Sequence, residues 1–291
     1  MTTRQAIFSF SILLTSTAAV QIVRAEPAYK VLKQVAYAQV DDGQLMMDVV
    51  VPTGKSSGVG IIDVASGAGF ARINELGQER IAEIFCGRGY TLFVVRPGPM
   101  VKYSVIDMAD HVQKAIVFVK ENADQYQVDA DDLGLLSTSA GVHLVALVAA
   151  TANDQTAVKA AGVYFPPTDL SETDAQNLYV QSDGAGWEQV MQKAFPGSRA
   201  VSSVAADAAG VRDPRIKMPD VSKQAPKFLI VHGDLDPLVS LGKKNLLFSA
   251  MRDAGVATDM IVRRPGREPG PTIQAEVKTL ADWFDKQLAT D

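Results

Sequence analysis

The 291-residue chain has 28 Lys and Arg residues against 33 Asp and Glu residues, so its formal net charge is −5. An acidic chain has no general electrostatic attraction to a polyanion, which argues against nucleic acid as a partner. With 47% hydrophobic residues, 21% charged residues and Gly and Pro scattered without a period, the composition excludes a collagenous or disordered protein and predicts a globular one with a sizeable core.

The first 25 residues have the features of a secretory signal peptide. A basic residue precedes a mainly apolar run at 6–23, and Val23 and Ala25 fit the −3 and −1 positions of a cleavage site. The run contains Ser, Thr and Gln and is short for a bilayer-spanning helix, so a retained anchor is the weaker alternative. We therefore expect residues 26–291 to be an exported protein, periplasmic or extracellular, with no membrane span.

The rest of the chain alternates between strand and helix patterns. Two β-rich runs at 35–40 and 45–52 flank a Gly-containing turn, which predicts a hairpin. Further strands are expected at 59–65, 90–95, 133–137, 159–165, 227–233 and 258–264, and helices at 74–88, 105–126, from 140, at 241–254 and at 272–288. This alternation of strand and helix predicts an α/β fold in which helices cover both faces of a mostly parallel sheet.

Residues 169–224 interrupt the alternation. They are rich in Gly, Ser, Asp and Pro, with one plausible helix near 187–195. Because a structureless loop of this length is uncommon in a compact domain, the segment predicts a small cap or lid, with a partly disordered excursion as the alternative. The mature chain is thus expected to be a single domain with a cap insertion.

The strongest motif is LGLLSTSAGVHLVAL, in which a predicted strand runs through Ser137-Thr138-Ser139-Ala140-Gly141 into a predicted helix. The nucleophile elbow of α/β enzymes follows G-x-S-x-G, because glycine relieves crowding in the tight turn. Ser137 replaces the first glycine, which is tolerable because serine is small, and Gly141 keeps the second. The pattern also fits an ordinary Gly-containing turn, but its place between a buried strand and a helix favours Ser139 as a nucleophile.

Two further segments follow strands that are expected to end at the same edge of the sheet. In SGAGF, the backbone N–H groups of Gly67 and Ala68, with that of Ala140, are candidates for an oxyanion hole. A plain Gly-rich turn is the alternative, and a dinucleotide site is disfavoured because the third glycine is missing. In HGDLDPLV, Asp236 follows Ser139 in the order that a Ser-acid-His triad requires, although it also fits a helix cap.

Together with the closing TLADWFDKQL, these segments resemble the esterase and lipase branch of the α/β-hydrolase superfamily, including its secreted members similar to feruloyl and acetyl esterases. The resemblance covers nearly the whole mature chain. It implies an α/β-hydrolase fold, action on small-molecule carboxylic esters and no cofactor. It also implies Ser139 as the nucleophile, Asp236 as the triad acid, and Gly67, Ala68 and Ala140 as oxyanion donors.

The sequence departs from this family at the general base. The family's histidine lies in the loop after the last strand, which here reads RRPGREPGPT, with Arg267 where the histidine is expected. A guanidinium cannot accept the proton of a serine hydroxyl. We hypothesise that Arg267 forms an ion pair with Asp236, and Glu268 is a conceivable substitute base if burial raises its pKa.

The other reactive side chains are expected to be structural. His111, His143 and His232 are the three histidines of the chain, and no two of them have the close spacing of metal ligands, so no metal site is predicted. Cys86 is the single cysteine and lies on the apolar face of a predicted helix, where a thiol packs as a small hydrophobe.

Three functions are compatible with these patterns. The first is a secreted serine hydrolase that acts on carboxylic esters with a degenerate triad. The second is a catalytically inactive binding protein with the α/β-hydrolase fold, because a fold does not guarantee its usual activity. The third is a purely structural exported protein without an open pocket. No motif specifies the ester or the oligomeric state.

Overall fold

The computed structural model describes residues 28–41, 43–65, 75–98, 103, 105–138, 141–164, 221–233, 248–249, 251–264 and 273–288. The predicted signal peptide at 1–25 and the helix expected near 187–195 lie outside these residues. So does the predicted cap at 169–224, except for residues 221–224.

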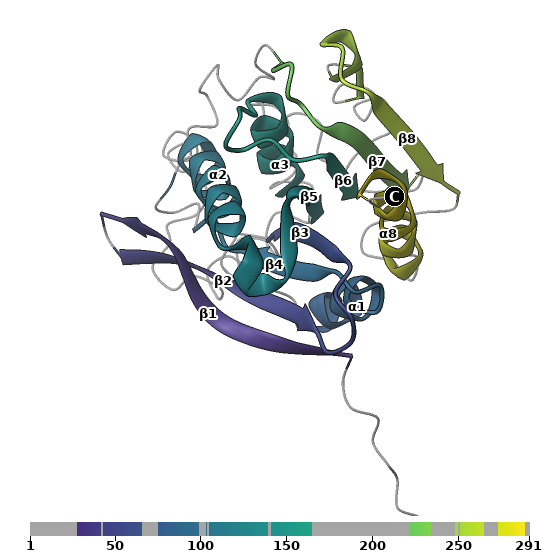
Figure 1. Ribbon diagram of the computed structural model, residues 1–291. Helices are drawn as coiled ribbons and strands as arrows, with labels where there is room; N and C mark the ends of the chain where they lie inside the picture. The colour runs from purple at the N-terminus through teal and green to yellow at the C-terminus, as the bar shows by residue number, and fades with distance from the viewer. Residues whose placement is uncertain are drawn as a thin grey trace, which may run out of the picture.

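The described strands form one eight-stranded sheet in the order β1-β2-β4-β3-β5-β6-β7-β8 (Figure 1). Strand β2 runs antiparallel to both of its neighbours, while β3 to β8 are all parallel to one another. The predicted, mostly parallel sheet is therefore confirmed. The strands are β1 (Tyr29–Val40), β2 (Gly43–Pro52), β3 (Gly58–Val64), β4 (Thr91–Val95), β5 (Val128–Thr138), β6 (Ala160–Tyr164), β7 (Lys227–Gly233) and β8 (Thr258–Arg263).

Helices cover both faces of the sheet, as predicted (Figure 1). On one face α1 and α8 pack through buried residues such as Phe85 and Phe284. On the other face α2 and α3 pack through residues such as Met108 and Val145. The helices are α1 (Glu75–Cys86), α2 (Val105–Glu121), α3 (Gly141–Ala150) and α8 (Ile273–Leu288), and a 3-10 turn, η1 (Ala123–Tyr126), follows α2.

The helix predicted at 105–126 is shorter in the structure, because Asn122 ends it. The side chain of Asn122 donates a hydrogen bond to the carbonyl of Phe118 at 2.8 Å, and its backbone N–H reaches the carbonyls of both Phe118 and Val119. Gln127 then adopts a left-handed conformation with φ of 56°, which turns the chain from η1 into β5.

The predicted hairpin is present, with Val40 paired to Gly43, but β1 begins six residues earlier than the apolar pattern at 35–40 indicated. The first half of β1 lies at the edge of the sheet and is exposed, so it carries no apolar periodicity. Gln34 has a positive φ of 59° within an irregularity of the β1–β2 pairing.

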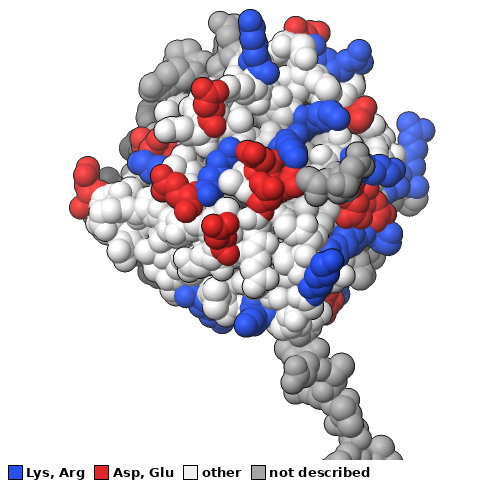
Figure 2. Space-filling model, in the orientation of Figure 1, with Lys and Arg blue, Asp and Glu red and all other residues white. Residues whose placement is uncertain are grey.

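Side chains of both charge signs are interspersed over the face of the molecule in Figure 2.

A half-buried ion pair links this hairpin to the parallel strands. The guanidinium of Arg96, just after β4, donates to both carboxylate oxygens of Asp48 in β2 at 2.8 and 3.0 Å. Asp48 also accepts the backbone N–H of Gln34 at 2.8 Å, and the Tyr37 hydroxyl donates to the Arg96 carbonyl at 3.0 Å. The hydrogen bonds from Arg96 hold the pKa of Asp48 below its ordinary value, although burial opposes this.

Helix α8 packs on the same face of the sheet as α1, where two glycines of the sheet let it approach closely. A Cβ on Gly134 of β5 would lie 2.8 Å from the ring of Phe284, and one on Gly162 of β6 would lie 2.9 Å from Phe284 and Leu280. The missing side chains therefore let the helix approach the middle of the sheet closely. Among the described residues, no helix is long and apolar enough to span a membrane.

Candidate functional site

The four predicted site loops begin at one edge of the sheet. Strands β3, β5, β7 and β8 are parallel, so the segments that follow Val64, Thr138, Gly233 and Arg263 all leave the carboxyl edge. The residues predicted to act there lie outside the described residues: Gly67, Ala68, Ser139, Ala140, Asp236, Arg267 and Glu268. The described strands and helices around them define how the chain enters and leaves each loop.

The sheet also has its topological switch at this point. Strand β3 lies between β4 and β5, the next two strands of the chain. The chain leaves β3 toward α1 on one face and leaves β5 toward α3 on the other face. In open α/β sheets, the crevice beside such a divergence of neighbouring loops is the usual ligand site. The segments with the candidate nucleophile and the candidate oxyanion donors follow β5 and β3, the two neighbouring strands from which the chain diverges in this way.

The connection from β5 to α3 has the compactness of a nucleophile elbow. Strand β5 ends at Thr138 and helix α3 begins at Gly141, which leaves only two residues between them. A Cβ on Gly141 would lie 2.3 Å from the Ser137 hydroxyl oxygen and 3.1 Å from the carbonyl oxygens of Val64 and Ala65. A side chain at position 141 would collide with Ser137 of β5 and crowd the carbonyl oxygens at the end of β3, which explains why the motif has a glycine here.

Ser137, which stands in place of the usual first glycine, makes a specific contact. Its Cα is paired with that of Val64 in the β3–β5 ladder, and its hydroxyl donates a hydrogen bond to the Val64 carbonyl at 2.8 Å. The side chain is completely buried. The sequence explained only why a small residue is tolerated at this position, whereas this contact depends on the register of two strands.

The three histidines lie in packed secondary structure. In α2, Nδ1 of His111 lies 2.6 Å from the Pro97 carbonyl oxygen, and its ring meets that of Tyr103 edge to face at a centroid distance of 4.7 Å. His143 lies in α3 with 8% of its surface exposed, and His232 is fully buried in β7. All three rings are thus packed among neighbouring residues, and a structural role for each stays a prediction.

Cys86 has the surroundings of a packing residue. Its thiol is buried in α1 and donates to the Val50 carbonyl at 3.8 Å. Burial raises its pKa to about 12, so the nucleophilic thiolate is strongly disfavoured at neutral pH. In the described part of the chain, no three His, Cys, Asp or Glu side chains are grouped so that they could hold a metal ion.

Asp63 is a buried carboxyl group that the sequence motifs did not single out. It lies in β3 between Val94 of β4 and Leu136 of β5, and it shares a face with Ile61, which packs toward α1 and α8. Asp63 is 8% exposed, and its carboxyl group makes no hydrogen bond or ion pair with any described residue. Burial raises its pKa to about 7. The signal in the sequence was a lone Asp within an otherwise apolar strand.

A second acidic group is buried at the same end of the molecule. Glu276 lies in the first turn of α8 and has no exposed surface. Because α8 follows β8, it begins near the carboxyl edge of the sheet. Asp63 and Glu276 are thus both carboxyl groups buried beneath the edge that holds the candidate site.

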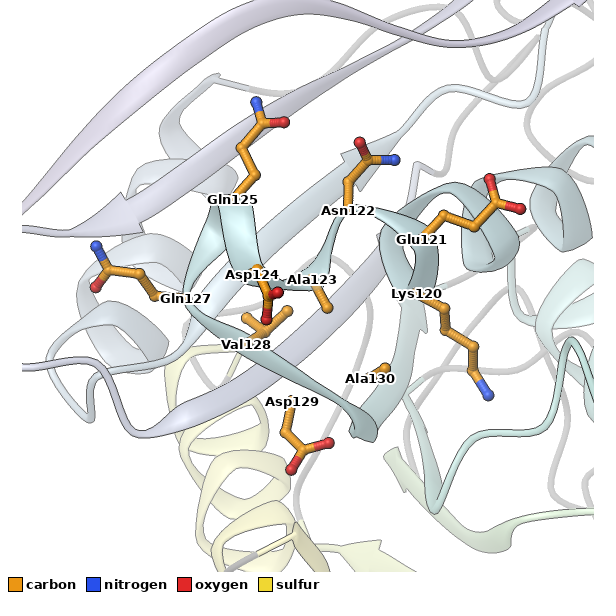
Figure 3. A pocket seen from close by; sticks show the side chains of 10 residues that line it. All are labelled: Lys120, Glu121, Asn122, Ala123, Asp124, Gln125, Gln127, Val128, Asp129 and Ala130. Atoms are coloured by element: carbon orange, nitrogen blue, oxygen red, sulfur yellow. The ribbon is translucent and has the colours of Figure 1, made fainter.

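The pocket shown in Figure 3 lies at the opposite edge. Its lining comes from the end of α2, from η1 and from the start of β5. The carboxylates of Glu121, Asp124 and Asp129 point in different directions and do not converge on one point (Figure 3). The whole length of β5 separates this pocket from Ser139, so it is not part of the candidate site. Its lining residues are Lys120, Glu121, Asn122, Ala123, Asp124, Gln125, Gln127, Val128, Asp129 and Ala130.

Comparison with known proteins identifies a family. The model of the BD-FAE family matches residues 47–251 of this chain. The match includes Ser139 and Asp236 and ends before Arg267. Esterase LipQ of Mycobacterium tuberculosis is 31% identical over 178 residues, which are 58% of this chain and 39% of that esterase. The chain therefore matches less than half the length of this curated relative.

Solved structures of esterases share the fold. A truncated carbohydrate esterase from gut microbiota has a TM-score of 0.68 at 21% identity, covering 91% of this chain and 99% of that one. Thermogutta terrifontis esterase 2, solved phosphoramylated by tabun, has a TM-score of 0.63 at 18% identity, covering 94% of this chain and 100% of that one. These likenesses confirm the α/β-hydrolase fold, and the family match extends over most of the sequence. The chain belongs to the BD-FAE family, in the esterase branch of the α/β-hydrolase superfamily.

Proposed function

We propose that this protein is an exported serine hydrolase that acts on carboxylic esters, with Ser139 as the nucleophile. The observation that carries the proposal is that only two residues connect β5 to α3, and that Gly141, the first residue of α3, has no room for a side chain beside Ser137 and the end of β3. This connection follows the carboxyl end of β5, at the sheet edge where α/β folds bind ligands. Membership of a family of esterases supports the same chemistry.

In the proposed reaction, the Ser139 hydroxyl gives its proton to a general base as its oxygen forms a bond to the ester carbonyl carbon, and the carbonyl π electrons move onto oxygen; the base later passes this proton to the departing alkoxide. The N–H groups of Gly67, Ala68 and Ala140 would stabilise this oxyanion. The tetrahedral intermediate collapses, the bond to the alkoxy oxygen breaks, and the alcohol leaves with a proton. Water then hydrolyses the acyl-serine by the same steps, which releases the carboxylic acid and restores the serine.

The acceptor of the serine proton is the weak part of this machinery. Arg267 stands at the family's histidine position, and we propose that it pairs with Asp236 instead of acting as a base. Glu268, the next residue, is the substitute proton acceptor within the same loop. A serine hydrolase without its histidine retains mainly the rate that oxyanion stabilisation and binding supply, so slow turnover is expected.

A catalytically inactive binding protein is the second candidate function. The observation that favours it is the absence of any histidine after His232, together with the burial of all three histidines in packed elements. Such a protein would bind an ester or a related small molecule in the same crevice. Its ligand affinity would be unchanged by Ser139→Ala.

Fluorophosphonate labelling of the chain from Glu26 onward separates the two functions. Covalent modification of Ser139, located by mass spectrometry and lost in Ser139→Ala, supports the hydrolase. If the unaltered protein is not labelled but Arg267→His is, the chain is a hydrolase scaffold that lacks only its base, and the binding function is favoured. Arg264→His, in the same loop, is the matched control and should gain no labelling.

Restoring a general base typically accelerates a reaction by about 10²- to 10⁴-fold. We therefore expect Arg267→His to be labelled at least about 100-fold faster than the unaltered protein. Equal rates in Arg267→His and Arg264→His would contradict the assignment of position 267 to the base.

Export is proposed from the first 25 residues alone. Expression of the full-length chain in a bacterial host should yield a product that begins at Glu26 in the periplasm or medium, as N-terminal sequencing would detect. A product retained in membranes with residues 1–25 attached would instead indicate an anchor.

A further inference from the structure

Two hydrogen bonds hold the chain at the end of β3, one toward β4 and one toward β5. On the β4 side, the Ala65 backbone N–H donates to the Val95 carbonyl at 2.9 Å. On the β5 side, the Val64 carbonyl accepts the Ser137 hydroxyl at 2.8 Å. These bonds hold the last strand residue and the one after it, immediately before the segment that contains Gly67 and Ala68.

The second of these bonds comes from the elbow itself. Ser137 lies two residues before Ser139 and is completely buried. A glycine, the usual residue at this position, has no hydroxyl and could not make the bond. Serine at this position therefore supplies a side-chain hydrogen bond, here called the tie, between β5, which precedes Ser139, and β3, which precedes Gly67 and Ala68.

Gly141 makes space for this tie. Its missing Cβ would lie 2.3 Å from the Ser137 hydroxyl oxygen, a separation that atoms not bonded to one another do not reach. The same Cβ would lie 3.1 Å from the Val64 carbonyl oxygen that accepts the bond. The three residues thus depend on one another: Ser137 donates the hydrogen bond, Val64 accepts it, and Gly141 leaves the space in which it forms.

We propose that Ser137 is a positioning residue of the proposed hydrolase, which holds the oxyanion turn in register with the nucleophile. The inference rests on the proposed function and acts through Gly67 and Ala68, since Ser137 is buried and does not touch substrate. Oxyanion donors act only when they are aimed at the charge that develops in the transition state, and a small misplacement weakens them. Loss of the tie therefore slows the chemical step more than it weakens binding.

The test compares Ser137→Ala and Ser137→Gly with Ser57→Ala in the chain from Glu26 onward. Ser57 is the matched control, because its hydroxyl donates to the Gly89 carbonyl at 3.1 Å just before the opposite end of β3. For each protein, the limiting rate of fluorophosphonate labelling at Ser139 and the reagent concentration at half that rate are measured. All measurements are made at a temperature where every variant is folded.

We expect both Ser137 variants to lower the limiting rate by about 10-fold, a part of the 10²- to 10³-fold typical for loss of an oxyanion donor. The half-saturating concentration should stay within about twofold, and Ser57→Ala should match the unaltered protein in both quantities. A purely structural role of Ser137 would lower thermal stability in both Ser137 variants without changing the limiting rate. Equal limiting rates in all four proteins would overturn the inference.

A second measurement decides the inference if the unaltered protein is not labelled, which is the outcome that contradicts the proposed function. Amide hydrogen exchange at residues 65–70 is followed in the same four proteins. Faster exchange in both Ser137 variants than in Ser57→Ala supports the tie, whether or not the protein is a hydrolase. Exchange that is the same in all of them refutes it.

Discussion

Asp63→Asn is expected to stabilise the protein at alkaline pH and to have little effect in acid. Burial raises the pKa of Asp63 to about 7 from an ordinary 3.8. Since each pKa unit corresponds to about 1.4 kcal/mol, ionising this carboxyl in the native state costs about 4 kcal/mol relative to the unfolded chain. Asparagine has nearly the same shape and no charge, so it removes this cost.

The sign follows from proton binding by the two states. Below pH 4 both states hold the proton, and the carboxyl contributes nothing to the pH dependence. Between pH 4 and 7 the unfolded chain releases the proton while the native state keeps it, so the free energy of unfolding falls as pH rises. Above pH 7 the loss is complete. The advantage of Asp63→Asn should therefore grow from below about 1 kcal/mol at pH 4 to about 4 kcal/mol at pH 8.

Urea unfolding of the two proteins at pH 4 and pH 8 measures this difference directly. By calorimetry at pH 8, the melting temperature of Asp63→Asn should be higher by roughly 10 °C. Asp131→Asn, at an exposed position of β5, is the control and should be neutral within about 0.5 kcal/mol at both pH values. If Asp63→Asn is no more stable than the unaltered protein at pH 8, or if its advantage is the same at pH 4, the reasoning from burial is wrong.

Three further substitutions test the packing described above. Asp48→Asn should lower the free energy of unfolding by about 2 kcal/mol at pH 7. Because Arg96 lowers the pKa of Asp48, this loss of stability should shrink as pH falls below 4. Urea unfolding at pH 3 and pH 7 measures the difference. Gly141→Ala should cost about 3 kcal/mol from its collisions, and Ser137→Gly in the same chain should recover part of this loss in a double-mutant cycle. Phe284→Ala should cost about 3 to 5 kcal/mol, because its fully buried ring fills the space above the sheet; a melting temperature unchanged from the unaltered protein would contradict this.

Much of the fold could be predicted from the sequence because its strands are buried on both faces. Runs such as 59–65 and 227–233 are apolar without alternation, and each was found close to its observed bounds. The early parts of β1 and β5 were missed for the opposite reason. Lys30 and Lys33 lie on an exposed edge, and residues 128–132 include three aspartates, so neither segment has the pattern of a buried strand.

Features of the candidate site could be predicted where they depend on residues close together in the sequence, and not where they depend on residues far apart. The predicted elbow around Ser139 is a local motif, since the strand that ends at Thr138 and the helix that begins at Gly141 are only two residues apart in the chain. The hydrogen bond from Ser137 to Val64 depends on the register of strands whose residues are 73 positions apart, which no local pattern contains. The raised pKa of Asp63 likewise depends on burial by β4, β5 and the helices of one face.

The position of α8 has a consequence for the order in which the chain folds. The last helix of the sequence covers the middle of the sheet through Phe284, which packs against the glycines of β5 and β6. During synthesis this apolar face stays uncovered until residues 273–288 have been made, long after β5 and β6, so the core on this face cannot be completed early. An uncovered apolar face makes a nascent chain prone to aggregation, and a truncation before residue 273 should yield insoluble protein.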